Sequence, residues 1–201
     1  MSNFDTNNIA LSINNSLSAA RALFNKDGLF RIIDIPFFDC SILTNTDTDG
    51  KNLPEVIKDK LFKYLHQYDN DEKKVNEYPC LYVFELYDEA DSARVVNAIK
   101  KTKETEINRI LPAIKSQIPC SKYLYVGKVL KEVGGRLVTH LGYYQTNGNH
   151  GLQLAFWARE MSPALRLKIT VLRFEKEMTP YMSSFEKLLA VDLNPIIGKH
   201  G

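Results

Sequence analysis

The sequence contains few of the residues that cross-link small proteins. Only three of its 201 residues are cysteines, Cys40, Cys80 and Cys120, so they cannot all pair with one another. This usage favours reduced, buried thiols and an intracellular, cytoplasmic protein. A zinc site drawn from Cys80, Cys120, His140 and His150 would need ligands from scattered elements without paired spacing, which argues against one.

Long apolar runs are missing as well. The longest are a few residues, far short of the roughly 20 that a membrane-spanning helix needs. The first residues, MSNFDTNN, are polar and acidic rather than basic and then apolar, so we expect no secretion signal. With 44% hydrophobic and 25% charged residues, the composition excludes a disordered tail, a collagen-like repeat and a disulfide-rich mini-protein. We expect a core that closes without a metal or a disulfide.

The net charge of +2 conceals an uneven distribution. Residues 1–121 hold 15 Lys and Arg against 18 Asp and Glu, whereas residues 122–201 hold 11 against 6. The basic half could face a polyanion such as a nucleic acid. A plain solvated surface explains the same imbalance.

Periodicity and turn residues predict strands and helices in an α/β or α+β order. We expect strands at 29–38, 80–86, 122–130 and 166–174, and helices at 16–24, 53–67, 88–117 (broken near Pro112) and from Gly134-Gly135 onward. Residues 152–160 are ambiguous between strand and helix. Thr179-Pro180 predicts an N-cap followed by Pro in the first turn of a last helix, which Asn194-Pro195 ends. The charged stretch 69–77 is the best candidate boundary between two parts of the chain.

Four residues in the second part have side chains or positions suited to phosphate chemistry. The strand KYLYVG ends at Gly127, where a backbone can approach a ligand closely. Arg136 and His140 are four residues apart on one helix face, and they combine a bidentate phosphate donor with a hydrogen-bonding or proton-moving group. Glu186 lies beside the apolar stripe of the last helix, where a carboxylate could hold Mg²⁺. Taken singly, Arg136, His140 and Glu186 are more typical of a solvated helix face, and Tyr82 and Tyr125 of half-buried sheet aromatics.

In their order along the chain, these residues resemble the GIY-YIG nuclease family. Cys80-Leu81-Tyr82 stands where the family has its first tripeptide, and Tyr125-Val126-Gly127 matches the second, with Lys128 after it. Arg136 and His140 in GGRLVTHLGYY follow, and then Glu186 in SFEKLLAVDL. The resemblance covers residues 78–201 and does not extend to residues 1–77.

The resemblance implies a small three-stranded antiparallel sheet flanked by helices, and metal-dependent cleavage of phosphodiester bonds. It implies that Glu186 is the ligand of Mg²⁺ or Mn²⁺ and that Tyr82 and Tyr125 lie by the scissile phosphate, one of them orienting or deprotonating the attacking water. Arg136 would stabilise the charge on the pentacoordinate phosphorus, and His140 would assist proton transfer or phosphate binding. These roles agree with the general physics of metal and cationic catalysis. The residues assigned to substrate binding are Gly127, Lys128, Asn194 and Lys199.

Two features depart from the family pattern. The first tripeptide is CLY, so only its Tyr is retained, and the late Asn of the family has no clear counterpart after Pro195. Tyr82 and Tyr125 are 43 residues apart, which implies a helical insertion over residues 88–121. A parallel crossover is the alternative interpretation of such a spacer, and it would not place the two strands in an antiparallel hairpin.

The sequence therefore predicts an N-terminal accessory α/β region over residues 1–77 and a GIY-YIG-like nuclease domain over residues 78–201. The predicted function is a metal-dependent endonuclease acting on DNA, of a restriction or mobile-element kind, and a homodimer is one arrangement for it. The alternative is a non-catalytic module on the same fold that binds nucleic acid or another protein.

Overall fold

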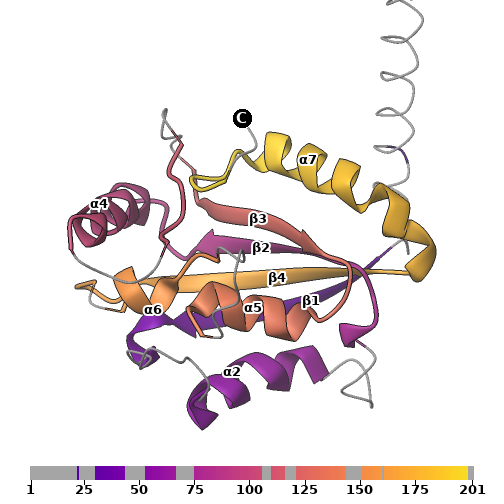
Figure 1. Cartoon of the computed structure of the whole chain (residues 1–201), viewed down its shortest axis with the longest axis horizontal. Coiled ribbons are helices and arrows are strands. Elements are labelled where there is room, and N and C mark those ends of the chain that lie inside the picture. The colour runs from indigo at the N-terminus through magenta and orange to yellow at the C-terminus, as the bar shows by residue number, and fades with distance from the viewer. Residues whose placement is uncertain are drawn as a thin grey trace, which may run out of the picture.

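The computed structural model describes residues 22, 30–43, 53–66, 75–105, 110–115, 121–143, 151–159 and 161–198. Within them the chain is an α/β protein with one antiparallel sheet and helices packed around it (Figure 1). The strands are β1 (Phe30–Asp39), β2 (Cys80–Leu86), β3 (Tyr123–Val129) and β4 (Arg166–Phe174). The helices are η1 (Cys40–Ile42), α2 (Glu55–His66), α4 (Asp91–Lys103), α5 (Val133–Leu141), α6 (Leu154–Trp157), η2 (Lys176–Tyr181) and α7 (Met182–Leu193).

The sheet has the strand order β1-β4-β2-β3, and every neighbouring pair is antiparallel. The expectation of three strands is therefore wrong in its count, because β1 adds a fourth at the edge next to β4. The pairing of β2 with β3 is antiparallel, with Tyr82 opposite Gly127, so the parallel crossover is excluded. The two strands form a hairpin although residues 87–122 lie between them.

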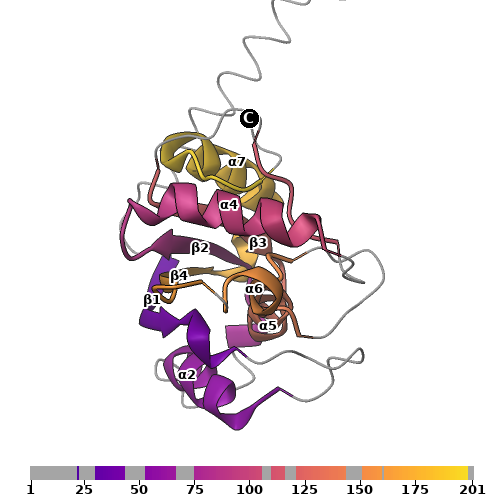
Figure 2. The ribbon, with the colours of Figure 1, turned by 90° about the vertical axis from the view of Figure 1, so that its left-hand side faces the viewer.

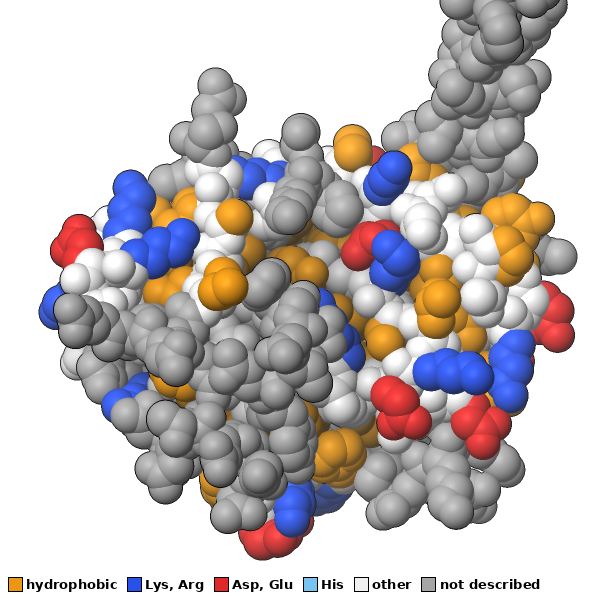
Figure 3. Space-filling model, viewed as in Figure 1, with side chains coloured by type: hydrophobic (Ala, Val, Ile, Leu, Met, Phe, Trp, Pro, Cys, Tyr) orange, Lys and Arg blue, Asp and Glu red, His pale blue; other side chains and the backbone are white. Residues whose placement is uncertain are grey.

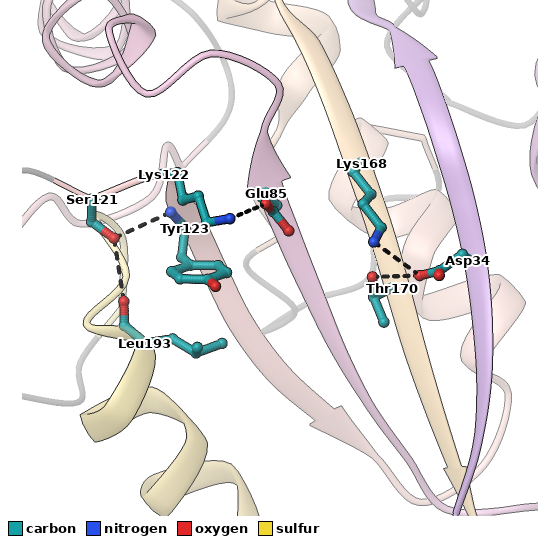
Figure 4. A network of polar contacts seen from close by, with 8 residues as sticks. All are labelled: Asp34, Glu85, Ser121, Lys122, Tyr123, Lys168, Thr170 and Leu193. Atoms are coloured by element: carbon teal, nitrogen blue, oxygen red, sulfur yellow. Dashed lines mark hydrogen bonds and ion pairs between the residues drawn. The ribbon is translucent and has the colours of Figure 1, made fainter.

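β1 comes from the predicted accessory region and pairs with β4, so the sheet crosses the proposed boundary near residue 77. Pro36 lies where the register shifts between Ile35 and Phe38, which suits a residue that cannot donate a ladder hydrogen bond. Asp34 links the edge strand β1 to β4 through its side chain. Its carboxylate accepts a 2.7 Å hydrogen bond from Thr170 and lies 3.5 Å from Lys168 Nζ (Figure 4). The division into two parts stays a prediction, but the N-terminal part contributes a strand to the shared sheet.

Alternate residues of β2 face two different layers. Leu81 packs with Phe185 of α7 on one face, whereas Tyr82 and Phe84 belong to the larger core on the other. That larger core is covered by α2, α5 and α6, and α4 packs across one end of the strands (Figures 1 and 2). The fold is therefore a three-layer arrangement in which α7 and α5 lie on opposite sides of β2 and β3.

The end of α7 is tied to the beginning of β3. Ser121 Oγ donates to the Leu193 carbonyl at 3.2 Å and accepts from the Tyr123 amide at 3.1 Å, while Lys122 pairs with Glu85 of β2 at 2.8 Å (Figure 4). Two further backbone hydrogen bonds, from Ile196 and from the residue after it, join the chain beyond α7 to the same strand. These contacts fix α7 along the sheet and so fix the position of its side chains.

Three expectations about helices need correction. The helix expected over 88–117 ends at Lys103, and Ile114 instead forms an isolated bridge with Ile197. The expected N-cap Thr179 lies inside η2, because the chain makes a tighter turn there and α7 begins only at Met182. The helix expected over 16–24 lies outside the described residues except for residue 22.

Residues 154–157 settle the ambiguous segment as a short helix, α6. The strands expected at 80–86 and 166–174 are confirmed at those bounds, and those at 29–38 and 122–130 within a residue. In the part of the chain that the structure describes, no helix has the length and apolar character needed to cross a bilayer.

Candidate active site

Gly127 makes room for two tyrosine rings on one face of the sheet. Tyr82 of β2 lies opposite Gly127 of β3, and the rings of Tyr82 and Tyr125 have centroids 6.2 Å apart. A Cβ atom on Gly127 would lie 2.6 Å from Tyr82 Oη and 2.7 Å from Tyr125 Cε1, closer than real contacts allow. The glycine is therefore a requirement of this packing, and its backbone φ is not unusual.

Helix α5 places two more of the predicted residues beside the hydroxyl group of Tyr82. Arg136 and His140 lie one turn apart on the face that packs against the sheet. Arg136 Nε donates to Tyr82 Oη at 3.1 Å, and His140 Nε2 lies 3.0 Å from the same oxygen. The imidazole also packs against both tyrosine rings, with centroid distances of 5.2 Å to Tyr82 and 4.9 Å to Tyr125. Three elements thus converge on one phenol.

His140 is fully buried, and both of its ring nitrogens have partners. Its Nδ1 accepts a hydrogen bond of 3.1 Å from the Leu152 backbone amide. Because a backbone N–H can only donate, Nδ1 carries no proton, and the neutral ring has its proton on Nε2. Burial, together with the charge of Arg136, holds the pKa of His140 well below its usual value. His140 is therefore a donor to Tyr82 in this structure.

The two phenols are not ionised near neutral pH. Burial raises the pKa of Tyr82, and the neighbouring Tyr125 raises it further, while Arg136 opposes the shift. Burial also raises the pKa of Tyr125, against the lowering effects of Arg136 and of a hydrogen bond from Tyr82. Tyr82 thus accepts hydrogen bonds from Arg136 and His140, and its own proton points away from both. Tyr125 is the more exposed of the two phenols.

Glu186 of α7 and Lys128 of β3 form an ion pair beside this cluster. Lys128 Nζ lies 2.5 Å from Glu186 Oε2, and the Glu186 side chain is only 10% exposed, against 31% for that of Lys128. The charge of Glu186 raises the pKa of both Tyr82 and Tyr125. Of the five residues predicted as catalytic, Tyr82, Tyr125, Arg136 and His140 are therefore in mutual contact, and Glu186 on the α7 side of the sheet is linked to them through this electrostatic effect.

The residues present define what kind of metal could bind. Among the described residues there is no group of three or more His, Cys, Asp or Glu side chains that could hold an ion. A single carboxylate, that of Glu186, is compatible with Mg²⁺ or Mn²⁺, since Mg²⁺ is often held by one carboxylate together with substrate phosphates and water. For the zinc site drawn from Cys80, Cys120, His140 and His150, both ring nitrogens of His140 are already engaged, and Cys120 and His150 lie outside the described residues.

Two residues assigned to substrate binding are not brought into this cluster by the described contacts. Asn194 is the C-cap of α7, with a left-handed φ of 45°, and its side-chain oxygen accepts a 3.2 Å hydrogen bond from Lys115. Two turns of α7 separate it from Glu186. Lys199 lies outside the described residues, as do Cys120 and His150. The substrate roles of Asn194 and Lys199 stay predictions.

Sequence reasoning missed the segment that holds His140. The Leu152 amide binds its Nδ1, and Trp157 Nε1 donates to the Leu152 carbonyl at 2.7 Å. A backbone group has no sequence signature, and a single tryptophan is also typical of an ordinary core position. Gly151 was the available signal, because a glycine beside a polar loop permits close backbone approach.

The described part of the surface in Figure 3 mixes Lys, Arg, Asp and Glu side chains with apolar ones. On that part of the face, the Lys and Arg side chains are scattered among acidic and apolar ones and do not form one continuous patch. Charge distribution therefore adds little to the argument from the cluster itself.

A scan against protein-family models, a search of curated proteins and a search of solved structures found no match to this chain. The argument about function accordingly depends on the residues and their geometry.

Proposed function

We propose that this chain is a metal-dependent endonuclease of the GIY-YIG type that hydrolyses phosphodiester bonds in DNA. The observation that carries the proposal is the cluster in which Arg136 and His140 meet the Tyr82 hydroxyl group and Tyr125 packs against both rings, while the charge of Glu186 raises the pKa of both phenols. Such a cluster combines a guanidinium for phosphate, hydroxyl groups for a water and a carboxylate for a metal. Perturbed titratable groups collected in this way are typical of catalytic sites.

The proposed roles follow from where each side chain lies. Arg136 is fixed through its Nε on Tyr82 and would bind the phosphate, stabilising the charge that develops on its oxygens. Tyr125, the more exposed phenol, would contact the attacking water, while the buried Tyr82 packs beside the Tyr125 ring and holds Arg136 in place. Glu186 would hold Mg²⁺ or Mn²⁺. When bound, such an ion lowers the pKa of a water and neutralises phosphate charge.

Lys128 links the metal site to the substrate in this proposal. Its ammonium group neutralises Glu186 at 2.5 Å in the chain alone. An ion at Glu186 would compete with this ammonium group, which would then be available to a phosphate oxygen. Lys128 is a third exposed, so it can reorient without exposing a buried group.

The test is nicking of supercoiled plasmid DNA with Mg²⁺ or Mn²⁺. Arg136→Ala is expected to reduce the cleavage rate about 10²–10³-fold, as loss of one donor to a transition-state oxyanion does. Glu186→Gln is expected to abolish the dependence on metal together with the activity. Glu177→Gln, which removes an exposed carboxylate from η2, is the matched control and retains native cleavage. Full activity in Arg136→Ala and Glu186→Gln would contradict these roles.

The Lys128–Glu186 ion pair also supports the alternative, a non-catalytic module that binds nucleic acid or another protein. An ammonium group that permanently satisfies the carboxylate would leave no site for a metal. In that case a titration would detect no Mg²⁺ or Mn²⁺ binding while DNA binding remains tight and falls steeply with salt.

A further inference from the structure

A continuous chain of buried hydrogen bonds leads from Trp157 to Tyr82. Trp157 Nε1 donates to the Leu152 carbonyl at 2.7 Å, and the amide of Leu152 donates to His140 Nδ1 at 3.1 Å. On the other side of the imidazole, Nε2 lies 3.0 Å from Tyr82 Oη. The Trp157 indole therefore holds the carbonyl group of Leu152, and the amide group of Leu152 orients the His140 ring.

Gly151 allows this close approach. A Cβ atom at that position would lie 2.5 Å from the Thr139 carbonyl oxygen and 3.0 Å from His140 Cα. No side chain can therefore occupy position 151 without moving the segment away from the last turn of α5. Because the Leu152 amide follows directly, its hydrogen bond to His140 depends on this glycine.

Gln153, which follows Leu152, has a strained backbone conformation and an unsatisfied side-chain atom. Gln153 has a left-handed φ of 57°, which is uncommon for a residue with a side chain, and it is buried. Its Oε1 atom is buried and has no hydrogen-bond partner among the residues that the structure describes. Strain and an unsatisfied polar atom in a native core are typical of segments whose geometry serves a site.

We propose that Gly151, Leu152 and Trp157 are positioning residues, which hold His140 in the Nε2-protonated tautomer so that Nε2 donates to the Tyr82 hydroxyl group and the Tyr82 proton points away from the imidazole. The inference rests on the proposed nuclease function, and it changes the role expected for His140. A proton relay would need Nδ1 to exchange with water or substrate, but Nδ1 is enclosed and faces an N–H donor. His140 is thus a fixed donor, and Tyr125 is the phenol that the substrate reaches.

The first experiment uses Trp157→Phe in the full chain, which removes the indole donor and keeps an aromatic ring. Nitrogen NMR of the histidine rings, with His140 assigned by its loss in His140→Gln, reports the tautomer directly. We expect Trp157→Phe to broaden or shift the His140 resonances and to lower kcat for plasmid nicking about tenfold, with KM unchanged. Unchanged His140 resonances in a folded Trp157→Phe protein would overturn the inference.

The second experiment separates a fixed donor from a proton relay. His140→Gln retains an N–H group that can reach Tyr82, whereas His140→Phe fills the space without a donor. We expect both to be slower than native, with His140→Gln at least tenfold faster than His140→Phe. Equal losses in the two variants, with both proteins folded, would contradict the positioning role.

The two readouts also distinguish failure of the inference from failure of the proposed function. If the native chain nicks no DNA, the nuclease proposal fails, and the proposed positioning for catalysis fails with it. The NMR result still decides whether Trp157 controls the His140 tautomer. If the native chain nicks DNA and Trp157→Phe matches it in kcat, the inference alone is overturned.

Discussion

Tyr82 connects more of the candidate site than any other side chain described here. Its hydroxyl group accepts hydrogen bonds from Arg136 and His140, its ring packs beside that of Tyr125, and its Oη and Cζ atoms occupy the space beside Gly127. Such a network has little tolerance for displacement, because each partner is oriented by the others. The predictions at the scale of single residues concern this network.

Adding one methyl group at Gly127 should disturb both phenols. In Gly127→Ala the new Cβ atom would meet Tyr82 and Tyr125 at 2.6–2.7 Å, so we expect a loss of about 1–3 kcal/mol in the free energy of unfolding and at least a tenfold loss of nicking. Gly135→Ala is the control, since nothing lies within 4 Å of its Cβ position in α5. That variant should be about 0.5–1 kcal/mol more stable and fully active. Urea unfolding and plasmid nicking measure both, and a native-like Gly127→Ala would contradict the packing.

Burial of neutral His140 should make the fold sensitive to mild acid. The pKa of His140 is depressed in the folded chain, so below about pH 6.5 the unfolded chain binds a proton that the native state does not. The free energy of unfolding should therefore fall by up to about 1.4 kcal/mol per pH unit as pH decreases from 6.5. His140→Gln should lack this component. Urea unfolding between pH 7.5 and 5.0 checks it, and parallel stability curves for the two proteins would contradict it.

At the scale of elements, the antiparallel pairing of β2 and β3 is what brings the tyrosines together. The sequence predicted both strands, the first from its β-branched and aromatic residues, and their register in the structure places Tyr82 opposite Gly127. The sequence could not decide between a hairpin and a crossover, because residues 87–122 are long enough for either. Long-range pairing with β4 on the other side of β2 settles the direction in the structure.

The last helix shows a similar limit. Thr179-Pro180 has the chemistry of a helix start, but the 3₁₀ turn η2 takes up these residues and α7 begins later. The end of α7 was predicted correctly from Asn194-Pro195, because Asn tolerates the left-handed conformation and Pro cannot continue a helix. Local signals thus located the helix, while its first turn depended on packing.

The cap of α7 provides a test at this scale. Asn194 has a φ of 45°, so Asn194→Gly should keep the free energy of unfolding within about 0.5 kcal/mol of native, whereas Asn194→Val should lose about 1–2 kcal/mol. Urea unfolding distinguishes the two variants, and equal stability would contradict a capping role. The DNA affinity of the stable Asn194→Gly variant then decides whether the amide side chain also contacts substrate.

At the scale of the whole molecule, the chain builds one sheet from both of its predicted parts. Strands, helices and the five candidate catalytic residues could be predicted from periodicity and motif order, since these depend on local pattern. The place of β1 beside β4 could not, because strand pairing across more than 120 residues leaves no local trace. The hydrogen bond from the Leu152 amide to His140 could not be predicted for another reason, since every residue except proline has a backbone N–H.

The site as a whole also limits what the molecule can do. One carboxylate per chain suits one metal-dependent site, and one such site cuts one strand at a time. Cleavage of both strands would then need two chains or two successive nicks. A homodimer therefore stays a prediction that follows from the chemistry proposed for Glu186.

The most direct measurement is nicking of supercoiled plasmid DNA by the native chain and by Glu186→Gln, with and without Mg²⁺ or Mn²⁺. The account predicts nicked circles from the native chain only when metal is present, and none from Glu186→Gln. Equal metal-dependent nicking by both proteins would contradict the role of Glu186. No nicking by the native chain, together with the absence of metal binding, would contradict the proposed nuclease.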